Sequence, residues 1–411
     1  MDFKRLSQTL LFQVIVAIIL GIACSFFFPQ WLARVFITYN GLFSNFLGFF
    51  VPVLILALIT PAIAGLGRGA GKWLAVTSGI AYASTVMSGL IAYSVARGFY
   101  PTLLGGQSLN SNVSNIDDGA LKPFFEVKMP PPMDIMSALL LAFCVGVAMT
   151  TVKSDTLYAA ARELENVAMK VIESFILPQL PVFIFGMFLG LGMNGNIGST
   201  LAAFGKVLVL AIIMTVLLLL LQFFIASSFT GKNPVKALKN MAPAYFTALG
   251  TSSSAATIPV TYKATLSNGV EKNVAGFVIP LCATIHLSGS MMKIALFSFA
   301  IVYMAHLNVT VGLAVGFILM LGITMIAAPG VPGGAIMAAV GLLGSMLHFD
   351  DQMVALMIAA YIAIDSFGTA ANVTGDGAIA LIVDRFARGK ISDRQAEESF
   401  ERAEDNLDTN I

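Results

Sequence analysis

The chain alternates long apolar stretches with short polar or charged ones. Charge-poor windows occur near residues 9–33, 41–67, 73–96, 135–152, 174–200, 207–230, 273–304, 310–347 and 352–383. Most of them can form a helix of about 20 apolar residues, the length that crosses the hydrocarbon core of a bilayer. The pattern therefore predicts an all-α polytopic membrane protein.

Two apolar segments have a polar or flexible centre. They read PAYFTALGTSSSAATIPVTYKA (243–264) and ITMIAAPGVPGGAIMAAVGLL (323–343). Irregular backbone at membrane depth is tolerated only where protein buries it or where it lines a cavity. We predict two re-entrant helical hairpins, each followed by a spanning helix near 273–304 or 352–383. The alternative is that these glycines and prolines only kink ordinary spanning helices.

Basic residues in the short connections predict the orientation, because Lys and Arg favour the cytoplasmic side. They occur at Lys4, Arg5, Arg68, Lys72, Lys153, Arg162, Lys232, Lys236 and Lys239. This pattern places the N- and C-termini in the cytoplasm and the charge-poor connection 101–132 outside. An even number of crossings follows, so we predict eight transmembrane helices plus the two hairpins. One hairpin must open from each side, which gives the inverted-repeat topology typical of secondary transporters.

The composition agrees with a membrane location and excludes several partners. The 411 residues are 57% hydrophobic and 11% charged, whereas soluble domains carry about 25% charged residues. The net charge of +1 gives no reason to expect a nucleic acid partner. The three cysteines lie in apolar runs, and three histidines are too few for a His-rich metal cage. Membrane lipid is the expected surrounding.

A polar stripe runs through the last apolar window, in DSFGTAANVTGD (365–376). At about 100° per residue, Asp365, Thr369, Asn372 and Asp376 fall on one face of a helix. Carboxylates inside a membrane are costly, and they mark a functional site by default. The alternative is a structural role, as a buried ion pair or a set of hydrogen bonds between helices.

Three motifs in the C-terminal half, about 240–388, resemble a known family. They are TSSSAATIPVT (251–261), GVPGG (330–334) and the pattern from Asp365 through NVTGD (372–376). The resemblance is to the dicarboxylate/amino acid:cation symporter family, which includes sodium-coupled glutamate, aspartate and neutral amino acid transporters. It implies a transporter rather than an enzyme, a small-molecule substrate, an elevator mechanism and a homotrimer in the plasma (inner) membrane.

The resemblance also implies roles for single residues. Asp365 is similar in position to the residue that holds a substrate α-amino group, and Asn372 to the one that binds the α-carboxylate. Ser254 lies where a backbone N–H of the first hairpin meets that carboxylate. Val331 lies where a carbonyl of the second hairpin meets the amine. Thr369 matches a threonine of the pocket.

Sodium ligands follow from the same comparison. Asn372 and Asp376 resemble sodium ligands, and Thr85 is a further candidate. The family's usual NMDGT in the seventh helix is here HLSGS (286–290), so His286 and Ser288 replace an amide and a carboxylate. This departure weakens the expectation of sodium and leaves a proton as the other possible coupling ion. No cofactor is expected.

Lys293 is a second departure, because it lies inside an apolar run, seven residues after His286. Members of the family that carry acidic substrates have an arginine near the polar stripe, and none lies between Asp365 and Asp376 here. Lys293 is therefore predicted either to bind a substrate carboxylate in place of that arginine or to stand where a sodium ion would be. The alternative is that it extends to the membrane interface.

The predicted organisation has six parts. Residues 1–73 form scaffold helices 1 and 2, residues 74–100 form the third helix, which belongs to the transport domain, and residues 101–132 form the extracellular loop. Residues 133–200 form scaffold helices 4 and 5, residues 201–384 form the rest of the transport domain, and residues 385–411 form a cytoplasmic tail.

The predicted function is symport of a small amino acid or dicarboxylate, coupled to sodium, protons or both. The alternatives are an intramembrane aspartyl protease and a substrate-gated ion channel. An intramembrane aspartyl protease would need two carboxylates that share a proton, but Asp365 and Asp376 lie roughly 16 Å apart along one helix. A substrate-gated ion channel is the other, and saturable uptake against a gradient would distinguish the transporter from it.

Overall fold

The structure is a computed structural model that describes residues 10–67, 72–105, 122–152, 155–193, 197–328, 332–392 and 395–401. The first half of the chain forms α2 (Leu10–Ser25), α3 (Gln30–Gly67), α4 (Lys72–Leu103), α5 (Ile135–Val152), α6 (Asp155–Val171), the π-helical turn η2 (Ile172–Ile176), α7 (Leu177–Met193) and α8 (Ile197–Thr230). The second half forms α9 (Pro234–Asn240), α10 (Ala242–Thr251), α11 (Ser254–Ser267), α12 (Lys272–Ile285), α13 (Ser288–Met304), α14 (Val311–Ile326), α15 (Gly334–Leu347), α16 (Asp351–Ala363) and α17 (Asp365–Ala387).

Several of these helices are suited to a bilayer. Within the described residues, five helices are long and apolar enough to cross a membrane, and the bent pair α16–α17 brings the number to six. Helices α2, α5, α14 and α15 are apolar but shorter. The prediction of an all-helical, polytopic membrane protein is confirmed, while the number of eight crossings stays a prediction.

The helix boundaries differ from the apolar windows near the N-terminus. The window 9–33 is divided at Pro29, which lacks the N–H that would continue α2. The next helix, α3, then runs through polar positions that separate two windows in the sequence. Thr38 and Asn40 are accommodated there because their side chains donate to the carbonyls of Arg34 (2.7 Å) and Phe183 (3.0 Å).

Two pairs of short helices form hairpins where the polar centres predicted them. Helices α10 and α11 pack against each other across a two-residue break, and α14 and α15 do so across residues 327–333. In the first break Ser252 has a left-handed backbone with φ of 52°. The hydroxyl of Ser253 then caps α11 by accepting from the N–H of Ala256 at 3.2 Å. Helical hairpins are thus present, and their re-entrant course in the membrane stays a prediction.

The helix that follows each hairpin is interrupted. Helix α12 ends before His286 and α13 begins at Ser288. Helices α16 and α17 meet at Ile364 with a bend of 62°. Each was predicted as one spanning helix, and each is still long and apolar enough to form a single span, with irregular backbone at its break. Both breaks lie beside the polar stripe, so these backbone groups become part of the candidate site.

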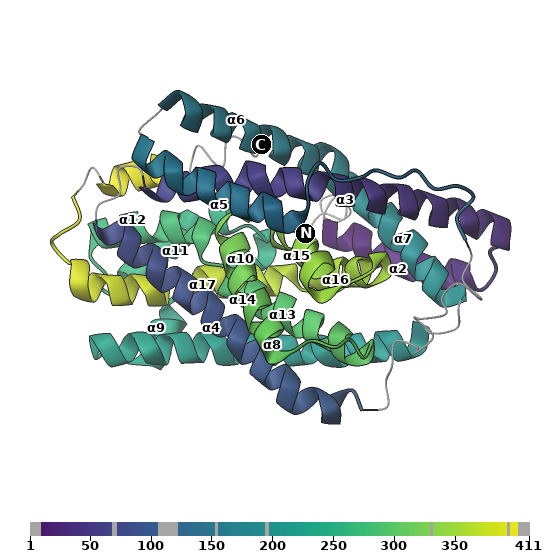
Figure 1. Cartoon of the computed structure of the whole chain (residues 1–411). Coiled ribbons are helices and arrows are strands. Elements are labelled where there is room, and N and C mark those ends of the chain that lie inside the picture. The colour runs from purple at the N-terminus through teal and green to yellow at the C-terminus, as the bar shows by residue number, and fades with distance from the viewer. Residues whose placement is uncertain are drawn as a thin grey trace.

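The helices form two packed groups. Helix α3 packs against α5, α6 and α7, and α2 packs against α7. Helix α4 packs against α13 and α14, and α17 packs against α8, α10, α11, α12 and α13. Figure 1 shows α3, α5 and α6 along one side of the molecule, α8 along the opposite side, and α10, α13, α14, α15 and α17 between them. The polar stripe of α17 is therefore enclosed by other helices.

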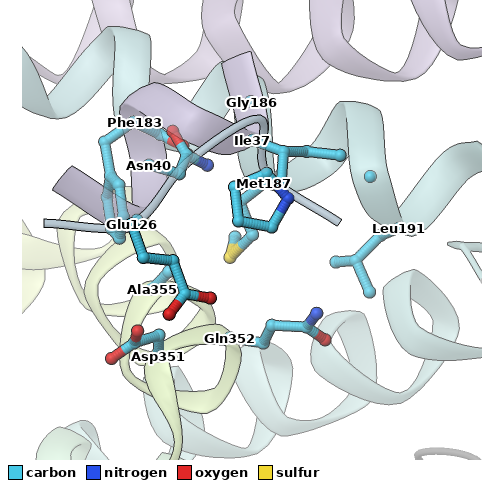
Figure 2. Close-up of a pocket in the computed structure, with 13 residues that line it drawn as sticks. Ile37, Asn40, Glu126, Phe183, Gly186, Met187, Leu191, Asp351, Gln352 and Ala355 are labelled. Atoms are coloured by element: carbon cyan, nitrogen blue, oxygen red, sulfur yellow. The ribbon is translucent and has the colours of Figure 1, made fainter. Parts of the chain in front are cut away.

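A cavity of about 260 Å³ lies between α3, α7, the segment 123–126 and the start of α16. Figure 2 shows that the polar side chains of Glu126, Asp351 and Gln352 line it together with the apolar Met187 and Leu191. None of the residues predicted as site residues lines this cavity. The cavity is therefore separate from the polar stripe.

Candidate functional site

The four polar residues predicted on one helical face all lie on α17 and are buried. Their exposed fractions are 7% for Asp365, 6% for Thr369, 3% for Asn372 and 1% for Asp376. Thr369 donates to the carbonyl of Asp365 at 3.2 Å, one helical turn back. The other three side chains contact different elements, so the face connects several parts of the fold.

Asn372 binds the N-terminus of α13. Its Oδ1 accepts from the N–H groups of Gly289 (2.8 Å) and Ser290 (3.3 Å), and its Nδ2 donates to Oγ of Ser290 (3.1 Å). The first N–H groups of a helix have no partner within the helix. The break before α13 therefore presents donors that the asparagine side chain satisfies, and Asn372 ties the broken helix to α17.

Asp376 pairs with the histidine at the same break. Oδ1 of Asp376 lies 2.9 Å from Nδ1 of His286, and Nε2 of His286 lies 3.0 Å from Oγ of Ser84. Gln222 on α8 donates to Oγ of both Ser84 (3.0 Å) and Ser288 (2.9 Å). A continuous polar chain therefore joins α4, α8, the α12–α13 break and α17.

Several buried oxygens beside this chain accept no hydrogen bond from the described residues. They are Oδ2 of Asp376, Oγ1 of Thr85, Oε1 of Gln222 and Oγ1 of Thr374. Hard oxygen atoms of this kind are the ligands that small alkali cations prefer. Oδ1 of Asp376 and Oγ of Ser288 are already engaged by His286 and Gln222. Among the predicted sodium ligands, Oδ2 of Asp376 and Oγ1 of Thr85 therefore have no hydrogen-bond partner in the described residues, whereas Oδ1 of Asp376 and Oγ of Ser288 are hydrogen-bonded to other side chains.

Lys293 lies at the other end of the stripe and is completely buried, with an exposed fraction of 0%. Its Nζ lies 3.5 Å from Oδ1 of Asp365 and donates to the carbonyls of Ile364 (3.0 Å) and Asp365 (3.2 Å). The ring of Tyr361 covers it, with 4.1 Å between Nζ and the ring centroid. The alternative in which Lys293 extends to the membrane interface is therefore wrong.

The remaining predicted residues lie at the hairpins. Ser254 begins α11 and is buried, with an exposed fraction of 6%. Val331 lies outside the described residues. Its neighbour Gly333 donates a backbone N–H to Oδ2 of Asp365 at 2.7 Å. The second hairpin therefore reaches the stripe through Asp365.

Three residues of the site were not found from the sequence. Ser84 and Gln222 belong to the polar chain, and the hydroxyl of Tyr361 donates to Oγ of Ser290 at 3.0 Å. Gln222 carried a usable signal, because it is the single polar side chain in the run VLLLLLQFF (216–224). Ser84 had no comparable signal, since serine is common at contacts between membrane helices.

The crossing of α13 and α17 gives a test of packing at the site. A methyl group at Gly289 would lie 2.6 Å from Cβ of Ala371 and 2.6 Å from the carbonyl oxygen of Gly368. We expect Gly289→Ala to lower the free energy of unfolding by about 1–3 kcal/mol, because the backbones cannot stay so close. Thermal unfolding in detergent measures this effect.

Gly312 is the matched control, because a methyl group there would meet nothing within 4 Å. Gly312→Ala should change the free energy of unfolding by no more than about 1 kcal/mol, in the stabilising direction. Equal effects of the two substitutions would show that the close crossing of α13 and α17 is not needed.

These features define a class: a polytopic helical membrane protein whose hairpins and interrupted helices surround a buried polar stripe, as in secondary transporters. The sodium:dicarboxylate symporter family matches this chain over residues 10–386. The chain belongs to that family, which consists of transporters rather than enzymes. The resemblance seen in the motifs of the C-terminal half is thereby confirmed over nearly the whole chain.

Individual relatives match over shorter stretches. The chain is 34% identical over 221 residues to excitatory amino acid transporter 1 of Rattus norvegicus, covering 52% of this chain and 39% of the relative. It is 37% identical over 175 residues to excitatory amino acid transporter 5 of Homo sapiens, covering 41% of this chain and 30% of the relative. The matches therefore span well under half the length of these relatives.

Proposed function

We propose that this protein is a secondary active transporter that moves a small amino acid or dicarboxylate together with a cation. The observation that carries the proposal is the meeting of the α17 stripe with the α12–α13 break, at Asn372, and with the second hairpin, at Asp365. The family description names sodium and dicarboxylates, and the relatives' names refer to excitatory amino acids. Both substrate classes therefore belong in the proposal.

The substrate would bind between the hairpin tips and the stripe. The proposed substrate contacts are Ser254, Val331, Lys293, Asp365, Thr369 and Asn372. Support comes from the contact of the second hairpin with Asp365 and from the burial of Ser254 at the tip of the first. A small polar molecule at this place would be shielded from lipid on all sides.

The coupling ion would bind near Asp376. Oδ2 of Asp376 and Oγ1 of Thr85 have no hydrogen-bond partner among the described residues and would coordinate a sodium ion, and Asn372 is the further predicted ligand. His286 and Ser288 stand where relatives are expected to have other ligands, and both are bound to neighbouring side chains. We therefore keep sodium and the proton as the two candidate coupling ions.

We further propose that the protein works by an elevator mechanism and forms a homotrimer. It would lie in the plasma (inner) membrane, with eight crossings, two inverted hairpin units and both termini in the cytoplasm. The scaffold would comprise 1–73 and 133–200, and the moving unit 74–100 and 201–384. The two packed groups of helices support this division. Within the proposed scaffold, the hydroxyl of Tyr39 on α3 donates a hydrogen bond to Gln179 on α7. Within the proposed moving unit, the hydroxyl of Tyr100 on α4 donates a hydrogen bond to the carbonyl of Leu296 on α13. The cavity in Figure 2 lies between α3 and α7 of the proposed scaffold and α16 of the proposed moving unit.

Uptake into proteoliposomes tests the proposed function. The purified protein is supplied with radiolabelled amino acids and dicarboxylates, while sodium and proton gradients are imposed separately. We expect saturable accumulation against a gradient with at least one of the two ions. Flux that does not saturate would indicate a channel, and cleavage of a membrane peptide would indicate a protease.

A further inference from the structure

Both carboxylate oxygens of Asp365 have partners within the protein. Oδ2 accepts the backbone N–H of Gly333, and Oδ1 lies 3.5 Å from Nζ of Lys293. The resemblance assigns Asp365 to the ammonium group of a substrate. In this structure Asp365 already faces an ammonium group, and that group belongs to the protein.

The ammonium group of Lys293 is surrounded on all sides. An ammonium has three hydrogens to donate, and three oxygens lie around this one: the carbonyls of Ile364 and Asp365 and the carboxylate of Asp365. The face of the Tyr361 ring covers the remaining side, an arrangement that attracts a cation. A substrate carboxylate would therefore have to compete with these three oxygens for the ammonium group of Lys293.

Gly368 makes room for this arrangement. A methyl group at Gly368 would lie 2.2 Å from Cε and 2.3 Å from Nζ of Lys293. The lysine side chain therefore occupies the space above α17 that a side chain at position 368 would fill. The carbonyl of Ile364, at the break between α16 and α17, accepts from Lys293 (3.0 Å) in addition to the backbone N–H groups of Phe367 (3.2 Å) and Gly368 (3.4 Å). Gly368 and the carbonyl of Ile364 thus both accommodate the same buried cation.

We propose that Lys293 takes the place of the substrate's α-ammonium group, and that the substrate is a small carboxylic acid without a charged amino group. This inference rests on the proposed function, because it concerns the same site. A substrate ammonium could reach Asp365 only by displacing Lys293. That displacement would leave a buried lysine without a counter-charge, which is strongly unfavourable.

Pairs of compounds that differ only in the amino group test the inference with the unmodified protein. Uptake of succinate is compared with aspartate, and uptake of propionate with alanine, in proteoliposomes under sodium and proton gradients. In the pair that is transported, the acid without the amino group should enter at least about tenfold faster, equivalent to about 1.4 kcal/mol. A smaller ratio, or a preference for the amino acid, overturns the inference and leaves the proposed function intact. If none of the four compounds accumulates, the proposed function fails and the inference fails with it.

Two variants test whether Lys293 is the residue responsible. In Lys293→Met the carboxylate of Asp365 is free to accept an ammonium, so the ratio of aspartate to succinate uptake should rise by about tenfold or more. In Lys293→Met with Asp365→Asn that rise should be absent. The same rise in both variants, or none in either, contradicts the assignment.

Loss of succinate and aspartate uptake in both variants, with propionate and alanine spared, also contradicts it. That result would show that Lys293 binds a substrate carboxylate directly. If the single variant does not fold, the comparison of compound pairs in the unmodified protein decides the question.

Discussion

Replacing Lys293 by methionine is expected to lower the free energy of unfolding by about 3–5 kcal/mol, the usual effect of removing one partner of a buried ion pair. Lys293 is fully buried, and Asp365 has an exposed fraction of only 7%. Without the lysine, Oδ1 of Asp365 would remain buried with its charge uncompensated. The carbonyl of Ile364 would also lose one donor, while it keeps the backbone N–H groups of Phe367 and Gly368. Thermal unfolding of the purified protein in detergent measures the loss.

The double substitution Lys293→Met with Asp365→Asn separates charge from packing. It removes both charges and keeps side chains of similar size, so most of the stability should return. Lys263→Met is the matched control, because Lys263 is exposed on α11. It should change the free energy of unfolding by no more than about 0.5 kcal/mol. A single variant as stable as the unmodified protein would show that Lys293 and Asp365 do not form a buried pair.

Replacing Asp376 by asparagine is expected to weaken the coupling between cation and substrate by about tenfold or more. The carboxylate pairs with His286 through Oδ1, while Oδ2 is buried without a hydrogen-bond partner in the described part of the chain. The substitution replaces a full negative charge by a neutral dipole, which attracts a cation far less. Uptake should therefore become nearly independent of the sodium and proton gradients.

Asp384 provides the matched control on the same helix. It is also buried, with an exposed fraction of 6%, but it accepts from the backbone N–H of Glu271 and pairs with Arg388. Asp384→Asn should reduce stability and leave the dependence of uptake on both gradients unchanged. If Asp376→Asn keeps the full dependence, the coupling ion binds at another place.

Much of the fold followed from patterns that are local in the sequence. The apolar windows predicted a polytopic helical protein, and the polar centres near Ser252 and Gly333 marked the turns of the two helical hairpins. The spacing of Asp365, Thr369, Asn372 and Asp376 placed them on one face, and α17 carries all four. Such predictions succeed because a helix imposes the same rotation at every residue.

The sequence by itself thus determined the membrane class, the family and the polar face of the last helix. Only the tertiary structure decided which groups that face meets. His286 contacts Ser84 across 202 positions and Asp376 across 90, and Lys293 reaches the carbonyl of Ile364 across 71. The sequence left two roles open for Lys293, a ligand for a substrate carboxylate or a replacement for a sodium ion, and it gave no sign that the ammonium group lies against Asp365. Helical periodicity specifies the direction of each side chain around its own axis. The partner of that side chain depends on where helices cross and break, and this is set by the packing of the whole chain.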